Sequence, residues 1–350
     1  MDKVRVGIVG SKFAADFHCD SYSRNEKVEI AAVAAIDNLP EISSKWGIPK
    51  AYEDYNEMME KEELHLISVC VPNFLHHDVV LAAAQHKLDV ITEKPMATSV
   101  ADCREMVKAC EEAGVKLFYG EDWVLMPALC RALDIVKSGG IGEALYIKAR
   151  EVHNGSHSPF AKKLNTCGGG SLIHLAMHPI GWVIYAMGQD NPVVEVTAKT
   201  SGGLDKNYVH KEFEGEDWAL GIMKFQDGRH ALIEGNYITV GGMDDMVEIY
   251  GSEGRMIIDM TFSSPIKCYS RGDIDYVIEK TDFTHGWTKP AVDEFYNLGY
   301  VHELGYFVDC VLKDEQPKFG VDGPTGVMCM QVVEAMYRSA KEGKSIAVEC

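Results

Sequence analysis

The fold is decided at residues 7–15, which read Gly7-Ile8-Val9-Gly10-Ser11-Lys12-Phe13-Ala14-Ala15. An apolar strand runs here into a glycine-containing turn, and a helix-like stretch follows. More apolar, β-rich segments recur at residues 29–35, 66–72, 89–94 and 116–121. These segments are apolar on both faces, which is typical of buried parallel strands. Because helix-like stretches separate them, we expect an α/β fold with a doubly wound parallel sheet.

The first turn carries a dinucleotide-binding pattern. Ligands of a doubly wound sheet bind at the carboxyl ends of its strands, where the Rossmann fingerprint is Gly-x-Gly-x-x-Gly/Ala. Gly10 and Ala15 occupy the first and third places, whereas Lys12 occupies the second. A lysine there would offer its charge to the phosphates, beside a helix N-terminus that already favours anions. We therefore expect cofactor contacts from Gly10, Lys12, Phe13 and Ala14, although a plain strand-to-helix turn remains an alternative.

The second strand ends close to an acidic residue. A carboxylate about 20 residues beyond the glycines binds the adenosine ribose in Rossmann domains. Asp37 stands two residues after Ala35, so it is either this ribose acceptor or an ordinary turn residue. No arginine lies beside it to bind a 2′-phosphate. The sequence thus favours NAD(H) over NADP(H) without excluding the latter.

Composition and charge exclude several classes of protein. The chain has 350 residues, 34 basic and 53 acidic side chains, and a formal net charge of −19. This balance argues against nucleic acid or an anionic membrane as partner, because both require a basic surface. No apolar run approaches the roughly 18 residues of a membrane span, and the N-terminus lacks a signal-peptide pattern. The 10 cysteines contain no C-x-x-C pair, so we expect reduced thiols and a cytoplasmic protein.

The ends of the third and fourth strands carry the most distinctive residues. The third ends near Pro72, Asn73 and His76, and the fourth ends in Thr92-Glu93-Lys94-Pro95. A glycine run with a following histidine and two later features extend the pattern: Gly168-Gly169-Gly170-Ser171 with His178, Gly251-Ser252-Glu253-Gly254, and a helix near 306–312 before Pro317. With these motifs, over essentially its whole length, the chain resembles the Gfo/Idh/MocA family, the glucose–fructose oxidoreductase and inositol dehydrogenase group.

The resemblance implies two domains. Residues 1–122 form an N-terminal dinucleotide-binding Rossmann domain. Residues 123–350 form a C-terminal α+β domain for substrate binding and oligomerisation, with a large, mostly antiparallel sheet that is open on one face. The second half agrees independently, because strand-like segments alternate with glycine-containing turns at residues 145–153, 193–201, 218–225, 230–239, 246–250 and 255–260.

The resemblance also implies the catalytic residues. Lys94 would lie beside the nicotinamide and polarise the reacting hydroxyl, and Pro72, Asn73, His76 and Glu93 would join the cofactor site. The family pattern after the glycine run is Asp-x-x-x-His on a helix. His178 matches the histidine and is the expected general base. His174 stands where the family has aspartate, so it brings no negative charge; it is either part of a proton relay or a packed helix histidine.

Further residues are candidates for substrate contact. His153 and His157 lie in a loop-like segment, and Trp123 follows the last Rossmann strand. Histidine, asparagine and serine side chains can bind sugar hydroxyls, and an aromatic face suits a sugar ring, although a surface loop and a core tryptophan are the alternatives. His-x-x-x-His is also a metal-binding spacing, but Leu175 stands where zinc proteases carry glutamate. We therefore expect no metal.

These residues predict an NAD(P)-dependent oxidoreductase that moves a hydride between nicotinamide and a secondary hydroxyl of a sugar, glycoside or polyol. Residues 215–218 and 241–245 are similar to a branch that oxidises glycosides at C3. One alternative is a redox-neutral enzyme that cleaves or isomerises glycosides with tightly bound NAD. A second is a non-catalytic sugar or cofactor sensor. The open sheet face implies a homodimer or homotetramer.

Overall fold

The computed structural model describes residues 3–156, 158–261, 264–274 and 284–349. The chain divides into two compact units. Unit 1 contains residues 1–125 and 299–330, and unit 2 contains residues 126–298 and 331–350. The sequence predicts a single boundary after residue 122, so the return of a late segment to unit 1 is an additional feature of the fold.

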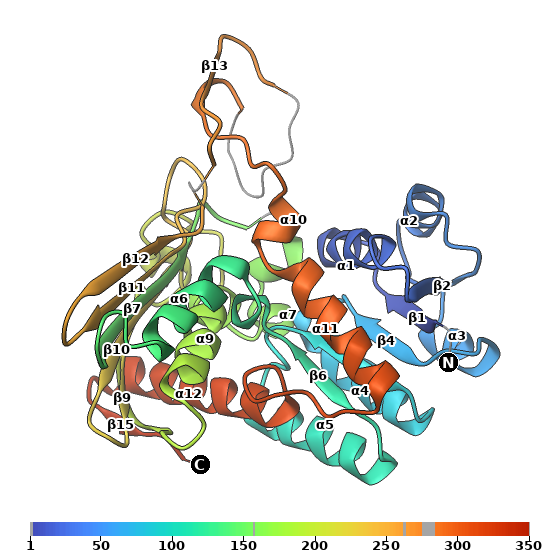
Figure 1. The fold of residues 1–350 in the computed structure, drawn as a ribbon, viewed down its shortest axis with the longest axis horizontal. Coiled ribbons are helices and arrows are strands. Elements are labelled where there is room, and N and C mark those ends of the chain that lie inside the picture. The colour runs from blue at the N-terminus through green and yellow to red at the C-terminus, as the bar shows by residue number, and fades with distance from the viewer. Residues whose placement is uncertain (1–2, 157, 262–263, 275–283, 350) are drawn as a thin grey trace. The chain divides into compact units, whose positions relative to one another are not determined.

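Unit 1 is built on a six-stranded sheet in the order β3-β2-β1-β4-β5-β6, with every neighbouring pair parallel (Figure 1). Its strands are β1 Val4–Val9, β2 Val28–Ala34, β3 Ala51–Tyr52, β4 Leu66–Val69, β5 Asp89–Glu93 and β6 Leu117–Gly120. The core strands are buried on both faces, which explains their unbroken apolar sequences. The predicted doubly wound parallel sheet is confirmed.

Helices connect and cover these strands. They are α1 Phe13–Ser23, α2 Leu39–Trp46, α3 Tyr55–Lys61, α4 His76–Gln85, α5 Val100–Ala113, α11 Tyr300–Lys313 and the start of α12 Gly323–Glu342, with 3₁₀ turns η1 Asn73–Leu75 and η2 Asp122–Val124. Local capping sets their ends. The Ser99 hydroxyl accepts the Asp102 N–H at 3.1 Å at the start of α5, and Gly114 ends that helix with a φ of 71°.

Unit 2 contains a seven-stranded sheet in the order β12-β11-β7-β10-β9-β8-β15. Its strands are β7 Ala144–Val152, β8 Val193–Thr200, β9 Trp218–Phe225, β10 His230–Asn236, β11 Met246–Gly251, β12 Arg255–Asp259 and β15 Ile346–Ala347. β7 and β10 pair in parallel, and the other neighbours are antiparallel. The predicted mostly antiparallel sheet is thus confirmed.

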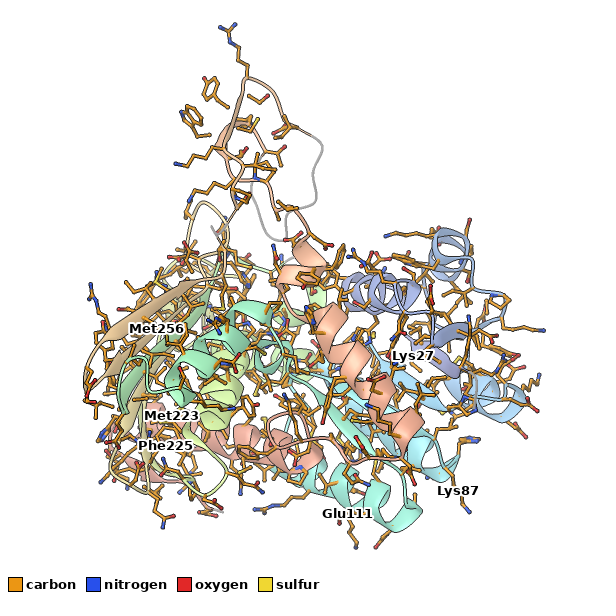
Figure 2. The ribbon with its side chains drawn as sticks, in the orientation of Figure 1. Lys27, Lys87, Glu111, Met223, Phe225 and Met256 are labelled. Carbon is orange, nitrogen blue, oxygen red and sulfur yellow. The ribbon has the colours of Figure 1, made fainter. Side chains whose placement is uncertain are left out.

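The two faces of this sheet differ. Along β9, the buried Met223 and Phe225, labelled in Figure 2, alternate with the exposed Ile222 and Lys224. The helices α6 Pro127–Lys137, α8 Ser171–His174 and α9 Met177–Met187 pack on the sheet, and α12 reaches β9 where Met336 meets Gly221. Exposed Leu145, Ile222 and Ile257 lie on strands of the same sheet.

The remaining elements of unit 2 are short. They are η3 Pro159–Lys162, α7 Leu164–Cys167, η4 Leu204–Lys206, α10 Glu294–Asn297 and a two-stranded hairpin of β13 Cys268–Ser270 and β14 Gly286–Thr288, which projects from the seven-stranded sheet in Figure 1. Among the helices in the described ranges, none combines the length and apolar character that a membrane crossing requires.

Candidate functional site

The turn after β1 is shaped by Gly10. Its φ is +126°, and a Cβ at this position would lie 2.2 Å from the carbonyl oxygen of Cys70, at the end of the neighbouring strand β4. Only glycine fits both the backbone angle and this close approach. The turn that leads into α1 therefore requires glycine at position 10, as the first position of a Rossmann turn does.

Lys12 and Asp37 meet beside this turn. Lys12 occupies the N-cap position of α1, and its Nζ lies 3.0 Å from a carboxylate oxygen of Asp37. The Ser11 hydroxyl donates to the other oxygen at 2.9 Å. The Lys12 ammonium and this hydroxyl hold the pKa of Asp37 below its usual value. Both charged side chains are more than half exposed, so a ligand can reach them.

Hydrogen bonds of a buried histidine hold the segment after β4 in place. Asn73 and His76 are buried, whereas Pro72 is half-buried. The His76 ring nitrogens lie 2.8 Å from the Pro95 carbonyl and 2.9 Å from the Val71 carbonyl. Burial lowers the pKa of His76, so a neutral ring donates to only one of these carbonyls at a time. His76 therefore ties the end of β4 to the turn after β5.

Glu93 holds the end of β5. One carboxylate oxygen lies 2.9 Å from Nε2 of the fully buried His18 of α1, and the other accepts the backbone N–H of Lys94 at 3.2 Å. Lys94 itself is half-buried. Glu303 of α11 is 1% exposed in the same unit, and burial, with Asp122 and Glu93 nearby, raises its pKa well above the usual value. Glu93 thus holds the backbone of Lys94, the residue for which the family resemblance implies a catalytic role.

The residues of unit 1 that the sequence predicts to contact cofactor or substrate differ in their exposure to solvent. Phe13 is 45% exposed and its ring is tilted by 47° against that of Phe17, with the centroids 4.3 Å apart. Ala14 is half-buried. Trp123 in η2 is 2% exposed, which is the burial of a core residue. A substrate role for Trp123 stays a prediction.

In unit 2 the expected histidine helix is interrupted. α8 ends at His174 and α9 begins at Met177, so residues 175–176 break the regular four-residue spacing. His174 Nδ1 pairs with the hydroxyl of Tyr237, which is fully buried. His178 is 6% exposed on α9 and faces Glu151. The two histidines therefore have different polar neighbours.

Glu151, near the end of β7, lies between two imidazoles. Its Oε1 is 4.0 Å from Nε2 of His153, and its Oε2 is 4.0 Å from Nε2 of His178. Glu151 is 4% exposed and His153 is fully buried. The Nδ1 of His153 lies 2.7 Å from the Gly155 carbonyl. His157, the other predicted loop histidine, lies outside the described residues.

The start of α8 rests on a buried carboxylate. Glu216 accepts the Leu172 N–H and the Tyr337 hydroxyl, each at 2.9 Å. Burial raises the pKa of Glu216 to about 6. The glycine run fits this contact closely, because a Cβ on Gly170 would lie 2.1 Å from the Glu216 carbonyl oxygen. The glycine run therefore lets the segment before α8 lie close to Glu216, whose carboxylate holds the start of the helix that carries His174.

Family models match nearly the whole chain. Residues 4–121 match an oxidoreductase family with an NAD-binding Rossmann fold, and residues 134–348 match the C-terminal α/β domain of the same family. The chain belongs to the Gfo/Idh/MocA oxidoreductase family. As a member of this family, it carries an NAD-binding Rossmann domain in its first part. The Gly10 turn and the adjoining Asp37 carboxylate fit such a dinucleotide.

Individual relatives agree with this membership. Myo-inositol 2-dehydrogenase of Thermotoga maritima is 25% identical, over 99% of both chains. The 2,7-anhydro-N-acetylneuraminate hydratase of Mediterraneibacter gnavus is 32% identical over 59% of this chain and 54% of the relative. The crystal structure of GenD2 from gentamicin A biosynthesis, in complex with NAD, superimposes on this chain with a TM-score of 0.91. The two sequences are 22% identical, and the superposition covers 100% of this chain and 97% of GenD2.

Several polar residues of this Gfo/Idh/MocA chain escaped the sequence analysis. Glu151 carried a usable signal, because residues two apart on a strand share a face and Glu151 precedes His153 by two. His18 carried a weaker one, because it stands among residues of α1 that are mostly apolar. Tyr237 carried none, because its partner lies 63 residues away in the sequence. Glu216 falls within the segment 215–218 noted above, but its partner Tyr337 lies 121 residues away, so the contact itself could not be foreseen.

Proposed function

We propose that this protein oxidises a secondary hydroxyl of a sugar, glycoside or polyol with NAD as hydride acceptor. The observation that carries the proposal is the edge of the parallel sheet in unit 1. There the glycine turn of Gly10 and the Glu93-Lys94-Pro95 segment both follow strands that end at the same edge. Relatives named as inositol and sugar dehydrogenases support the substrate class.

Each part of the chain has an assigned task in this proposal. Residues 1–122 bind the dinucleotide through the Gly10 turn and Asp37, and residues 123–350 bind the substrate. The Lys94 ammonium donates to the reacting oxygen and stabilises negative charge on it. His178 accepts the hydroxyl proton as general base. Bound NAD supplies the C4 position that takes up hydride.

Three histidines and a tryptophan supply the substrate contacts in our proposal. His153, His157 and His174 would bind hydroxyl groups, and Trp123 would offer an aromatic face. Hydroxyl-rich substrates suit such donors, because imidazoles both donate and accept hydrogen bonds.

A redox-neutral reaction is the second candidate. Relatives named as 2,7-anhydro-N-acetylneuraminate hydratases, 32% and 33% identical over 59% and 55% of this chain, favour it. A ketone formed next to a C–H bond acidifies that bond, so a glycosidic group could then leave by elimination. Such an enzyme turns over without added cofactor, which separates it from a dehydrogenase.

Exposed apolar side chains support an oligomer in this proposal, and the cysteines support a cytoplasmic location. The exposed apolar side chains of the seven-stranded sheet, Leu145, Ile222 and Ile257, would be covered by another copy, giving a homodimer or homotetramer. Among the described residues the cysteines form no disulfide bonds, as in a cytoplasmic protein. Sedimentation velocity tests the assembly, and a monomer at micromolar concentration would contradict it.

The first experiment is an analysis of nucleotide released from the purified protein by denaturation, using absorbance and mass spectrometry. Stoichiometric NAD(H) with turnover in the absence of added cofactor supports the redox-neutral reaction. Empty protein that binds NAD and oxidises members of a sugar, glycoside and polyol panel supports the dehydrogenase. Protein that binds nucleotide but converts no compound in the panel would move the sensor alternative to first place.

A further inference from the structure

The phenol of Tyr237 has no role in the chemistry described so far. Tyr237 directly follows β10 and is fully buried. Its N–H donates to the Asp217 carbonyl at 2.8 Å, and its carbonyl accepts the Gly155 N–H at 2.9 Å and Nε2 of His210 at 2.8 Å. Because both backbone groups are engaged and the ring is buried, the hydroxyl of Tyr237 has a fixed place within unit 2.

Two of the histidines expected to contact substrate lie beside this phenol. The ring centroids of His153 and His174 are 5.6 Å and 6.0 Å from that of Tyr237. His153 directly follows β7, and β7 and β10 are parallel neighbours that pair up to their last residues, Val152 and Asn236. Tyr237 and His153 therefore lie at the same end of the sheet, and His174 joins them through the Tyr237 hydroxyl.

The hydrogen bond between Tyr237 and His174 has a defined direction. Among the described residues, the hydroxyl has no hydrogen-bond partner other than Nδ1 of His174. Burial raises the pKa of Tyr237 well above its usual value, so the phenol keeps its proton. If Nδ1 donated to the phenol oxygen instead, the phenolic proton would be buried without an acceptor, which is costly. The hydroxyl therefore donates and Nδ1 accepts.

The tautomer of His174 follows from this direction. A neutral imidazole carries one proton on its two nitrogens, so an Nδ1 that accepts leaves the proton on Nε2. Nε2 of His174 is then a donor and cannot accept. His174 is half-buried, whereas Tyr237 is fully buried, so only the histidine of this pair can be reached by a ligand.

We propose that Tyr237 is a positioning residue that holds His174 as a hydrogen-bond donor, and that His174 thereby selects substrates with an oxygen that carries no proton. The inference rests on the proposed function, in which His174 contacts the substrate, and it refines that contact. Ether and carboxylate oxygens carry no proton, whereas every oxygen of a polyol does. The pair therefore favours glycosides and acidic sugars over free polyols within the proposed substrate class.

The reason for this preference is the second proton requirement of a hydroxyl. A substrate hydroxyl can accept from Nε2 of His174, but its own proton then needs another acceptor once the substrate is enclosed. An ether or carboxylate oxygen has no such requirement. An aspartate at position 174 would act in the opposite way, because an ionised carboxylate only accepts, pairs with hydroxyl protons and repels a substrate carboxylate.

The tautomer is tested directly by nitrogen NMR of protein labelled with isotopic histidine, at a pH where the His174 ring is neutral. The signals are assigned by their loss in His174→Asn. His153 is an internal reference for a protonated Nδ1, because its Nδ1 lies 2.7 Å from the Gly155 carbonyl, which can only accept. We expect the proton of His174 on Nε2 in the wild type and a mixture of both tautomers in Tyr237→Phe.

Tyr250→Phe is the matched control for this measurement. It removes another hydroxyl of unit 2, one that is bonded to Glu248 rather than to a histidine, at 2.5 Å. The control should leave the His174 signals unchanged. A wild-type protein with the His174 proton on Nδ1 would overturn the proposal, and so would a Tyr237→Phe variant with the wild-type tautomer.

The selection is tested with D-glucuronate, methyl β-D-glucopyranoside and myo-inositol as probes. The first presents a carboxylate, the second an ether oxygen in place of a hydroxyl, and the third only hydroxyl oxygens. Calorimetry in the presence of saturating NADH gives the dissociation constants without oxidation of the probe, and initial rates with NAD give kcat/KM. A preference for glucuronate identifies a carboxylate as the selected group, and a preference for the methyl glucoside identifies an ether.

We expect the wild type to bind one of the first two probes at least about tenfold more tightly than myo-inositol. His174→Asp should lower this ratio at least about tenfold, because it replaces the donor by an acceptor. His174→Asn should keep most of the ratio, since its amide can still donate, and it serves as the second variant if His174→Asp folds poorly.

The two measurements separate two failures. If the protein oxidises none of the probes, while the His174 proton lies on Nε2 and the binding ratio responds to His174→Asp, the proposed function fails and the assignment of the pair stands. If the binding ratio is the same in the wild type and in His174→Asp, the inference is overturned whatever the turnover. A wild type that binds myo-inositol best, or binds none of the probes, would equally refute the selection.

Discussion

The Nζ of Lys12 lies 3.0 Å from a carboxylate oxygen of Asp37. One residue belongs to the turn after β1 and the other follows β2, so the pair lies where we expect the adenosine ribose of the cofactor. A lone carboxylate there accepts ribose hydroxyls and repels a 2′-phosphate. The lysine offsets this repulsion, because it places a positive charge next to the carboxylate.

Cofactor preference should therefore depend on both members of the pair. We expect Asp37→Ala to weaken NAD binding by about tenfold, since hydrogen bonds to a charged group contribute about 1.5–3 kcal/mol. The same change should bring the dissociation constants of NADP and NAD close together. Lys12→Ala should increase the discrimination against NADP. Calorimetric titration with both nucleotides measures the ratio of the two dissociation constants. If this ratio is unchanged in both variants, Lys12 and Asp37 do not contact the cofactor.

Gly10 offers a test of the turn itself. Gly10→Ala places a Cβ 2.2 Å from the Cys70 carbonyl at a φ of +126°, so we expect a loss of at least about 3 kcal/mol of stability and of nucleotide binding. Gly305→Ala is the matched control in the same unit. Gly305 lies within α11, and a Cβ there would have no neighbour within 4 Å apart from the backbone of its own helix and the adjacent residues. The control should gain about 0.5–1 kcal/mol. Urea unfolding followed by circular dichroism compares the two.

Much of this fold was predictable from local pattern. The parallel strands were identified because both of their faces are buried, which leaves continuous apolar runs such as Leu66–Val69. The strands of unit 2 were identified because one face is buried and the residues alternate, as in Trp218–Phe225. The return of α11 to unit 1 could not be predicted, because an apolar helix face does not specify which sheet it covers.

The candidate site was predictable where one segment carries the signal. Gly10 and Lys94 follow strand ends, and strand ends are visible in the sequence. The partners that hold these residues were not visible. His18 reaches Glu93 across 75 residues and Tyr237 reaches His174 across 63, so only the folded chain brings them together. The helix break at residues 175–176 was also missed, although Pro179 marks it. In the first turn of α9 this proline has no N–H to donate to the Leu175 carbonyl, so a continuous helix would lose a hydrogen bond there.

Lys94 should be required for turnover and not for nucleotide binding. Removing a donor aimed at a developing oxyanion costs about 10²–10³ in rate, so Lys94→Ala should lower kcat at least that much. Lys108→Ala, on the exposed face of α5 in the same unit, is the control and should match wild type. Stopped-flow absorbance of NADH gives the rate, and fluorescence titration gives the affinity. Wild-type turnover in Lys94→Ala would refute its assignment.

The contact between His174 and Tyr237 should be energetically coupled. Tyr237 is fully buried beside Phe213 and Leu175, so Tyr237→Phe keeps the packing and removes only the hydroxyl. Each of Tyr237→Phe and His174→Ala should cost about 1 kcal/mol or more, and the double variant should cost clearly less than their sum. Unfolding free energies of the four proteins complete the cycle. Additive effects would show that the pair contributes no coupling.

The pH dependence of stability should reveal Glu216. Its pKa in the folded protein is about 6, above the ordinary value of 4.5, because burial disfavours the charged carboxylate. A carboxyl group whose pKa is raised by folding contributes its stability below pH 4.5, and that contribution is lost as the pH rises through 6. The shift corresponds to about 2 kcal/mol, at 1.36 kcal/mol for each pH unit.

Glu216→Gln removes this titration and keeps an acceptor for the Leu172 N–H. The stability of the wild type relative to the variant should therefore fall by about 2 kcal/mol between pH 4 and pH 7.5. Denaturant unfolding at five or six pH values across this range measures the difference. Glu234→Gln serves as control, because Glu234 also accepts a hydrogen bond from an aromatic side chain, that of Trp218, but is only partly buried. A constant difference between wild type and Glu216→Gln would mean that Glu216 does not titrate in this range.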